Sequence, residues 1–228
     1  MSFAERFTQN FIDEQRYLYL VKGLGNTVLI TIFAVLLGIL LGFLVAIIRT
    51  THERNSNLKI LDAICNAYLT VIRGTPVMVQ LLIMFYVIFA SSTNKIMVAI
   101  LTFGINSGAY VAEIVRSGIQ SIDRGQFEAG RSLGFTYSQT MRFIIIPQAI
   151  KNVLPALMNE LIVLLKETSV CGYIGLMDLT RGGDIIRSQT YSALFPLLAV
   201  AAIYLVIVCF LTYLVGRLER RLRTNERK

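Results

Sequence analysis

The sequence holds too little histidine and cysteine for most metal or nucleophile chemistry. The 228 residues include one histidine, His52, and three cysteines that lie far apart, Cys65, Cys171 and Cys209. A cluster of histidine ligands or a Ser-His-Asp triad cannot be built from a single histidine. No CxxC spacing occurs, so no metal site or disulfide framework is predicted, and the cysteines are interpreted as small packing residues.

Two further motifs are missing. The chain has no G-x-x-x-x-G-K-[ST] segment and no Gly-Lys pair, so no phosphate-cradling loop is predicted. If ATP drives this protein, another chain must bind it, and no cofactor is expected in this one. The first residues are polar and mixed in charge, which is not the pattern of a cleaved signal peptide.

Apolar blocks dominate what is present. Hydrophobic residues make up 55% of the chain, and the mean hydropathy is +0.63. This distribution predicts an all-α, polytopic membrane protein that forms a single domain over residues 1–228. The net charge of +8 gathers at the ends of the apolar blocks, which is typical of topology charges rather than of a nucleic-acid partner.

Five transmembrane helices are predicted, within a core over residues 24–216. The second is expected to follow a helix over 58–73 through a kink or break at Arg73-Gly74-Thr75-Pro76, because proline removes a backbone donor and disfavours helix at the preceding residue. Gly38 and Gly42 form a GxxxG that is either a close helix contact or an ordinary pair of membrane glycines. The predicted spans are residues 25–48, 74–94, 96–112, 143–165 and 188–216.

For the segments outside the spans, the sequence supports only broader predictions. The residues up to about Lys22 are either an interfacial helix or a disordered lead-in. Residues 171–189 are interpreted as an outer loop with short helical pieces, and residues 217–228 as a basic cytoplasmic tail.

The Lys and Arg residues indicate the orientation. If the N-terminus is outside and the C-terminus inside, the inside segments hold clearly more of these residues than the outside ones. The positive-inside rule therefore predicts this topology. It also places the polar stretch 126–149 in the cytoplasm.

That stretch begins as a short helix over 123–134. Asp123 is positioned to cap it, with Gln126 completing a capping box, and Gly134 is positioned to end it. Residues at helical spacing are expected to share one face, namely Phe127, Gly130, Leu133 and Tyr137. A capped amphipathic helix in a loop on the inner side of the membrane is typical of a surface that binds a partner protein.

Several motifs carry a resemblance. Residues 128–130 (EAG), Leu133-Gly134 and Ile146-Pro147 with Ala149 resemble the EAA loop of bacterial ABC importer permeases, which has alanine in place of Gly130 and usually leucine in place of Ile146. Three further blocks resemble the polar-amino-acid branch of that family, and together they span about residues 24–216. These blocks are residues 73–76 (RGTP) with Gln80, residues 108–119, and residues 166–169 (KETS).

The resemblance implies an importer in a bacterial cytoplasmic (inner) membrane. It implies two ABC ATPase subunits that bind ATP and Mg, a second permease subunit as homodimer or heterodimer, an extracytoplasmic solute-binding protein and an amino acid substrate. The loop helix would sit in a groove of the ATPase, whereas the alternative is a helix that packs only on its own bundle. Glu128 is expected to pair with Arg124 or Arg131. The ATPase-coupling residues would be Gln126, Phe127, Glu128, Ala129, Gly130, Ser132, Leu133 and Gly134.

Polar residues inside the spans are candidates for the substrate path. A carboxylate suits an ammonium or guanidinium group, and asparagine or backbone donors suit a carboxylate. The alternative is that these residues only brace helices, and for Glu113 we favour a structural ion pair with Arg116. The predicted substrate-binding residues are Asn106, Ser107, Tyr110, Asn159 and Glu160.

The sequence thus predicts an importer permease for a polar, possibly cationic, amino acid, without an ATPase site of its own. An ion-coupled secondary transporter using Glu160 and Glu113 is the alternative, but no internal repeat is evident. A membrane scaffold or insertion factor is a third class.

Overall fold

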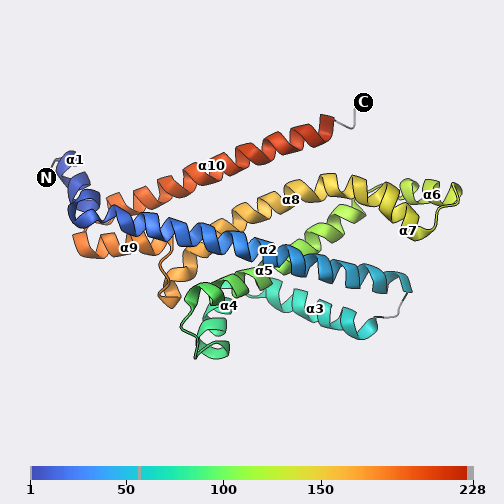
Figure 1. Cartoon of the computed structure of the whole chain (residues 1–228), viewed down its shortest axis with the longest axis horizontal. Helices are drawn as coiled ribbons and strands as arrows, with labels where there is room; N and C mark the ends of the chain where they lie inside the picture. Colours follow the sequence, from blue (N-terminus) through green and yellow to red (C-terminus); the bar gives the residue numbers. More distant parts are fainter. Residues whose placement is uncertain (1, 56–57, 225–228) are drawn as a thin grey trace.

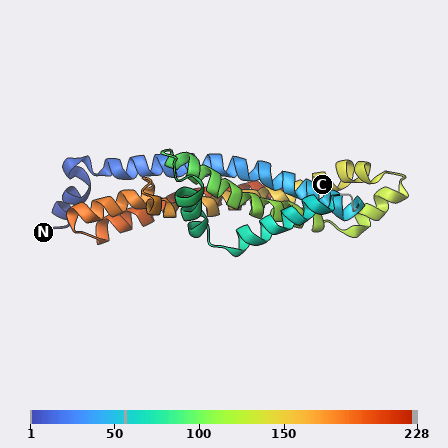
Figure 2. The ribbon, with the colours of Figure 1, turned by 90° about the horizontal axis from the view of Figure 1, so that it is seen from below.

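The computed structural model describes residues 2–55 and 58–224, and each regular element in these ranges is a helix. The helices form a flattened, elongated bundle (Figures 1 and 2). The long helices run mostly along its length, as expected for the predicted all-α membrane fold. They are α2 (Tyr17–Asn55), α5 (Lys95–Gln120), α8 (Ile146–Glu167) and α10 (Leu194–Thr224).

Four helical segments of the described chain are long and apolar enough to cross a membrane: Tyr17–His52, Lys95–Gln120, Tyr137–Ile174 and Leu194–Leu222. A fifth crossing is available if the bent pair Lys59–Gly74 and Val77–Ile88 counts as one span. This agrees with five predicted spans. The third long segment is continuous because α7 (Tyr137–Thr140) runs through a π-helical turn into α8.

Of the kink or break predicted at Arg73-Gly74-Thr75-Pro76, the structure has the break. Helix α3 (Lys59–Gly74) and helix α4 (Val77–Ile83), which continues into a π-helical turn over Met84–Ile88, meet at 108°. Thr75 and Pro76 are both extended there. Helix α3 therefore ends here and does not run on into α4, because a proline ring disfavours the helical conformation of the residue before it.

Helices α2 and α5 make the most extensive contact between helices in the described residues, and two glycines bring them close together. A Cβ on Gly38 would lie 2.8 Å from Cβ and Oγ of Ser107, and a Cβ on Gly42 would lie 2.5 Å from Cβ of Val111. The GxxxG is therefore a close helix contact, not an incidental pair of glycines. Gly104 on α5 accommodates Leu37 of α2 in the same way.

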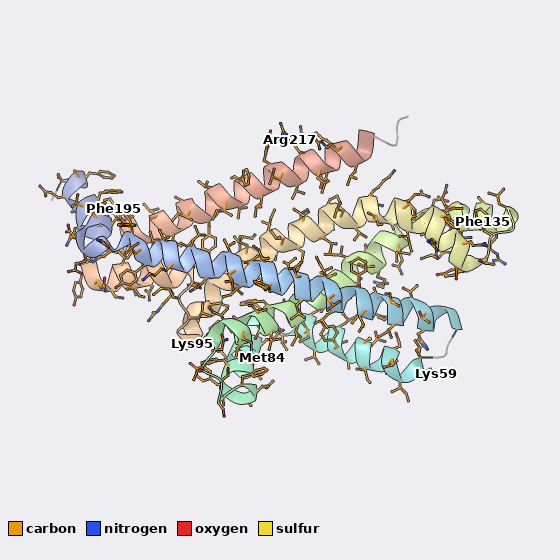
Figure 3. The ribbon with its side chains drawn as sticks, viewed as in Figure 1. Lys59, Met84, Lys95, Phe135, Phe195 and Arg217 are labelled. Atoms are coloured by element: carbon orange, nitrogen blue, oxygen red, sulfur yellow. The ribbon has the colours of Figure 1, made fainter. Side chains whose placement is uncertain are left out.

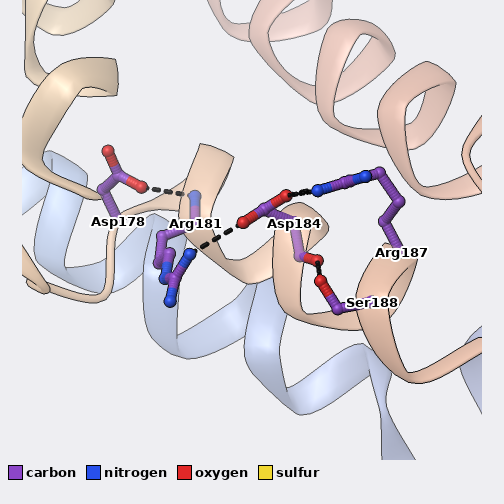
Figure 4. Close-up of polar contacts among 5 residues, drawn as sticks. All are labelled: Asp178, Arg181, Asp184, Arg187 and Ser188. Carbon is purple, nitrogen blue, oxygen red and sulfur yellow. Dashed lines mark hydrogen bonds and ion pairs between the residues drawn. The ribbon is translucent and has the colours of Figure 1, made fainter. Parts of the chain in front are cut away.

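Helix α9 (Leu179–Thr190) lies against α2 and α10. Asp178 begins it, since its Oδ1 accepts a hydrogen bond from the Arg181 backbone N–H at 2.5 Å, and Asp184 pairs with Arg181 and Arg187 (Figure 4). Burial raises the pKa of the Asp178 carboxyl to about 6. Helical pieces were predicted here, but the last span begins at Leu194, because Tyr191 is left-handed (φ 53°) and ends α9.

The N-terminal residues form a helix, α1 (Phe3–Phe7), followed by a π-helical turn over Thr8–Ile12 and a 3₁₀ turn over Asp13–Gln15. They pack onto the end of the bundle. The Phe3 ring lies 5.4 Å from that of Phe195, which Figure 3 marks beside α1, and Thr190 donates a hydrogen bond to Asn10. The segment is therefore helical, and its position at a membrane interface stays a prediction.

The two ends of the bundle carry different elements. Helices α6 (Arg124–Ser132) and α7, the end of α2 and the end of α10 lie toward one end, while α1 and α9 lie at the other (Figure 1). The segments predicted to lie inside the cell thus gather together. That this end faces the cytoplasm stays a prediction.

Candidate functional site

The predicted coupling helix is α6, and Asp123 caps it. The Asp123 Oδ1 accepts a hydrogen bond from the Gly125 backbone N–H at 2.6 Å. The predicted capping box is wrong, because Gln126 turns to the neighbouring helix instead. Its Oε1 accepts from Nε2 of Gln148 on α8 at 3.3 Å, so this side chain ties the loop to the membrane helix that follows.

Gly134 ends α6, as predicted. Its φ is 81°, in the left-handed region that glycine adopts without strain. The Phe135 N–H donates to the Gly130 carbonyl at 3.0 Å and the Gly134 N–H to the Arg131 carbonyl at 2.9 Å. This is a Schellman motif, which satisfies carbonyls at the helix end. The loop is therefore stabilised at both ends of its helix.

One face of α6 packs on the following helix. The Phe127 ring stacks on Tyr137 with centroids 6.4 Å apart, and Gly130 is buried. A Cβ on Gly130 would lie 2.7 Å from Cγ2 and 2.8 Å from Oγ1 of Thr140. Glycine in place of the alanine usual in the resembling motif therefore lets α6 approach α7 closely.

The opposite face is open. Gln126, Glu128, Ala129, Ser132 and Gly134 are exposed, and Leu133 is 72% exposed, so the expectation that Leu133 shares a packed face with Phe127 is wrong. Within the described residues, Glu128 forms no ion pair with Arg124 or Arg131, contrary to expectation. This face projects beyond the long helices at the tip that Figure 3 marks with Phe135.

A cavity of about 390 Å³ lies between α3, α5 and α8. Glu160 of α8 lines it, and the Glu160 Oε1 accepts a hydrogen bond from Oγ of Ser107 at 2.9 Å. Tyr110 lines the wall on the α5 side. The full lining is Arg73, Tyr110, Glu113, Ile114, Ser117, Gly118, Ser121, Asn152, Ala156 and Glu160.

Only some of the predicted substrate-binding residues therefore lie at this cavity. Tyr110 and Glu160 face the cavity, and Ser107 reaches it through Glu160. Asn106 is only 2% exposed and donates instead to the Gln80 Oε1 at 3.0 Å. Asn159 is exposed on α8 and is not in this wall. The structure does not bring Asn106 and Asn159 to the site of Glu160.

Arg73 also lines this cavity, although no role there was predicted for it. Its Nη1 lies 3.5 Å from Oε2 of Glu113, and its guanidinium lies 5.9 Å from the Tyr110 ring centroid. The predicted ion pair between Glu113 and Arg116 is confirmed. The sequence feature that could have indicated this position is the Gly74-Thr75-Pro76 break directly after Arg73, because the break places the end of α3 beside α5.

Arg73, Tyr110 and Glu113 also line a second cavity of about 590 Å³ on the side of α2 and α3, with Arg49 and Asn66 among its other walls. The Arg73–Glu113 pair thus stands between two cavities. Such a pair can block a substrate path while it is intact. It can also separate and bind polar groups of a substrate.

Known proteins resemble this chain over most of its length. Residues 35–224 match the family described as binding-protein-dependent transport system inner membrane component. The chain is 37% identical over 213 residues to the putative glutamine transport system permease protein GlnP of Rickettsia typhi, covering 92% of this chain and 95% of that protein. It is 35% identical over 211 residues to the arginine transport system permease protein ArtQ of Bacillus subtilis, covering 91% and 94%.

Two solved structures are also similar to this chain. An amino acid ABC transporter crystallised with histidines has 43% identity and a TM-score of 0.85, over 92% of this chain and 98% of that one. The MetNI methionine ABC transporter in an inward-facing conformation has a TM-score of 0.76 over 97% and 99% of the two chains, and its 21% identity shows the fold alone. The chain therefore belongs to the family of inner membrane components of binding-protein-dependent transport systems.

Proposed function

We propose that this chain is the membrane-spanning permease subunit of an ABC importer that moves a polar amino acid. The names of the relatives, which refer to glutamine and arginine transport, support this substrate class, as does the 43% identical amino acid ABC transporter. The observation that carries the proposal is the cavity between α3, α5 and α8, which presents the Glu160 carboxyl among membrane-spanning helices. Such residues ordinarily line substrate paths.

The exposed face of α6 is proposed as the docking surface for a cytoplasmic ATPase. It is capped at both ends and presents Glu128 and Leu133 outward. The inward face, at Phe127 and Gly130, transmits movement to α7 and so to α8. Gln126 contributes through its bond to Gln148, while Ala129, Ser132 and Gly134 complete the outward surface.

The proposed assembly has two ATPase subunits, a second permease subunit and an extracytoplasmic solute-binding protein. The ATPase binds ATP and Mg and hydrolyses the ATP, so this chain supplies no catalytic residue. The proposed location is the bacterial cytoplasmic membrane, with the N-terminus outside and residues 123–134 and the tail 217–228 inside. Residues 1–228 are proposed to form one transmembrane domain.

Uptake into proteoliposomes tests the function. The purified complex should take up glutamine or arginine only with the ATPase, its ATP and the binding protein present. Collapsing proton and sodium gradients should leave the rate unchanged. Uptake by this chain alone, driven by an ion gradient, would instead establish a secondary transporter.

A further inference from the structure

A cavity of about 520 Å³ lies where the ends of α2 and α5 meet α6 and α7. It shares no lining residue with the cavity at Glu160. Two arginines line it, together with the polar side chains of Thr50, Gln120 and Tyr137, and its lining within the described chain holds no aspartate or glutamate. The cavity is therefore basic, and it lies at the end of the bundle that carries α6 (Figure 1).

The two arginines, Arg116 and Arg124, differ in how the protein uses them. Arg116 donates to both carboxylate oxygens of Glu113, and its Nη1 donates to the Gln120 Oε1 at 3.2 Å. The Arg124 side chain has no hydrogen bond or ion pair with any described residue. Asp123 is not in the lining, and its Oδ1 accepts from the Gly125 backbone N–H. The charge of Arg124 is therefore left without a paired counter-charge.

The cavity lies at the depth of a membrane surface. Thr50 is close to the end of the span Tyr17–His52, and the span Lys95–Gln120 ends four residues before Arg124. The phosphates of membrane lipids lie just beyond the hydrocarbon, at the level where such spans end. Basic pockets between transmembrane helices on the cytoplasmic side are typical sites for anionic lipid headgroups.

An exposed apolar stripe on α2 leads to this cavity. Its residues recur every three or four positions within the span, and Thr50 follows at the same spacing, so all lie on one face of the helix. A lipid acyl chain lying along this face brings its headgroup to Thr50 and so to the cavity. The stripe consists of Leu36, Leu40, Phe43 and Ile47.

We propose that this cavity binds the phosphodiester headgroup of an anionic phospholipid, with Arg124 as its main cationic contact. A guanidinium has five N–H donors in a planar fork that fits a phosphate. Arg116, Thr50 and Gln120 complete the polar wall. Because the charge of Arg124 is unpaired, a lipid with a net negative charge binds more tightly than one whose headgroup carries its own cation.

The bound lipid joins two parts of the molecule. Within the described residues, α6 packs on α7 and the turn that follows, and no extensive packing joins it to α2. A headgroup held between Arg124 and Thr50 links the end of the first membrane helix to the loop helix. The lipid therefore restrains α6 from its inward side, where Phe127 also stacks on Tyr137.

This inference rests on the proposed function for the orientation that places α6 at the cytoplasmic surface. It uses a different face of α6 from the ATPase docking surface, since Glu128 and Leu133 point outward. Lipid and ATPase are therefore expected to bind at the same time, and the assembled complex is the right material for the test.

Native mass spectrometry of the detergent-purified permease–ATPase complex tests the inference. The complex is titrated with phosphatidylglycerol or with phosphatidylcholine of the same acyl chains, without ATP or amino acid. The wild type should bind phosphatidylglycerol about tenfold or more tightly, as for a hydrogen bond between charged groups. Arg124→Gln should remove most of this preference, and so should Thr50→Glu, which adds a negative charge to the opposite wall.

The matched control is Arg142→Gln, which removes the same charge from the turn after α7, outside the lining. It should keep the wild-type preference. Co-elution with the ATPase shows that each variant is assembled, and Thr50→Glu serves if Arg124→Gln does not assemble.

Three results overturn the inference. In the first, the wild-type complex does not prefer phosphatidylglycerol, as when an acidic side chain of the ATPase fills the cavity. In the second, both cavity variants keep the preference, or the Arg142→Gln control loses it equally. In the third, millimolar inorganic phosphate displaces the lipid, which would make this a site for free phosphate. ATP-driven uptake by the same preparation shows separately whether the proposed function stands.

Discussion

Ser107 on α5 donates its Oγ hydrogen to Oε1 of Glu160 on α8 over 2.9 Å, and Ser107 is fully buried. Gly38 of α2 lies directly behind Ser107. Three helices therefore meet at one intramembrane carboxyl group. A carboxyl group at this depth is costly unless it is paired or functional, and the hydrogen bond from Ser107 offsets part of that cost while Glu160 still lines the cavity.

Glu160→Gln should weaken uptake of both arginine and glutamine. The amide can still accept from Ser107 but carries no charge for an ammonium, so we expect the KM of each to rise about tenfold or more, as for a lost charged hydrogen bond. Initial rates in proteoliposomes measure this. Glu219→Gln on α10 is the control. An effect on arginine alone would mean that Glu160 binds the side-chain cation instead, and no effect would make it a brace.

Gly38→Ala should destabilise the contact between α2 and α5. The new methyl would lie 2.8 Å from Cβ and Oγ of Ser107, and overpacking of this kind costs about 1–3 kcal/mol. Unfolding in detergent should show the loss, together with slower uptake because Ser107 is displaced from Glu160. The control is Gly25→Ala on the same helix, where nothing lies within 4 Å. Equal stability of the two variants would contradict the tight crossing.

The sequence predicted the helices and the coupling loop because these depend on local patterns. Long apolar runs identify spans, and Asp123 and Gly134 mark the ends of α6 by cap chemistry alone. Even so, Gln126 was assigned to a capping box, while its side chain reaches Gln148, 22 residues away. A contact of that kind depends on how two helices pack.

The cavity was predicted only in part for the same reason. Tyr110 and Glu160 were singled out because polar groups in apolar spans stand out. Asn106 has the same sequence signature, but it faces Gln80 on α4 and not the cavity. Arg73 was passed over because its position depends on a 108° break, and the sequence showed that a break was possible but not its angle.

Leu133→Asp should weaken the association with the ATPase. Burying a leucine at an interface is worth about 1.5–3 kcal/mol, and this leucine is 72% exposed at the tip of the loop. We expect the ATPase dissociation constant to rise about tenfold or more, measured by titrating ATPase onto immobilised permease. The control is Leu194→Asp, a leucine that is 61% exposed and begins α10 at the opposite end of the bundle. Unchanged affinity would exclude Leu133 from the docking surface.

The stability of the wild-type protein should fall as pH rises from about 4 to 6, and Asp178→Asn should remove this fall. Burial raises the pKa of this carboxyl from 3.8 to about 6, so in that window the folded chain holds a proton that the unfolded chain has lost. Stability therefore falls as pH rises through the window and stays lower above it, by about 3 kcal/mol at most. Asparagine is also a good helix cap, so the variant should show a flatter stability profile.

Melting temperatures in detergent from pH 5 to 8 measure this difference. Asp184→Asn on the same helix is the control, because the hydrogen bond from Arg187 lowers the pKa of the Asp184 carboxyl. The stability that this group contributes is present above its unfolded pKa and is lost only as pH falls below it. Between pH 5 and 8 the Asp184→Asn curve should thus parallel wild type. A wild-type slope that persists in Asp178→Asn would assign the titration to another group.

Gln80→Met and Asn106→Leu should each destabilise the protein, and their effects should not add. Gln80→Met leaves the carbonyls of Ile72 and Thr75 without the side-chain donor, while Asn106→Leu leaves Gln80 Oε1 unpaired. Each lost hydrogen bond of this partly exposed kind costs about 0.5–1.5 kcal/mol. Because the two side chains share one hydrogen bond, the double variant should be more stable than the sum of the losses predicts, by about 0.5–1.5 kcal/mol.

Unfolding by SDS in mixed micelles measures the cycle. Asn66→Leu on α3 is the control for stability, because within the described residues its amide donates only to Asp62 in its own helix. Additive losses would reduce Gln80 and Asn106 to independent packing residues. A coupled loss would instead show that the helix break between α3 and α4 is held in place from α5 through these two side chains.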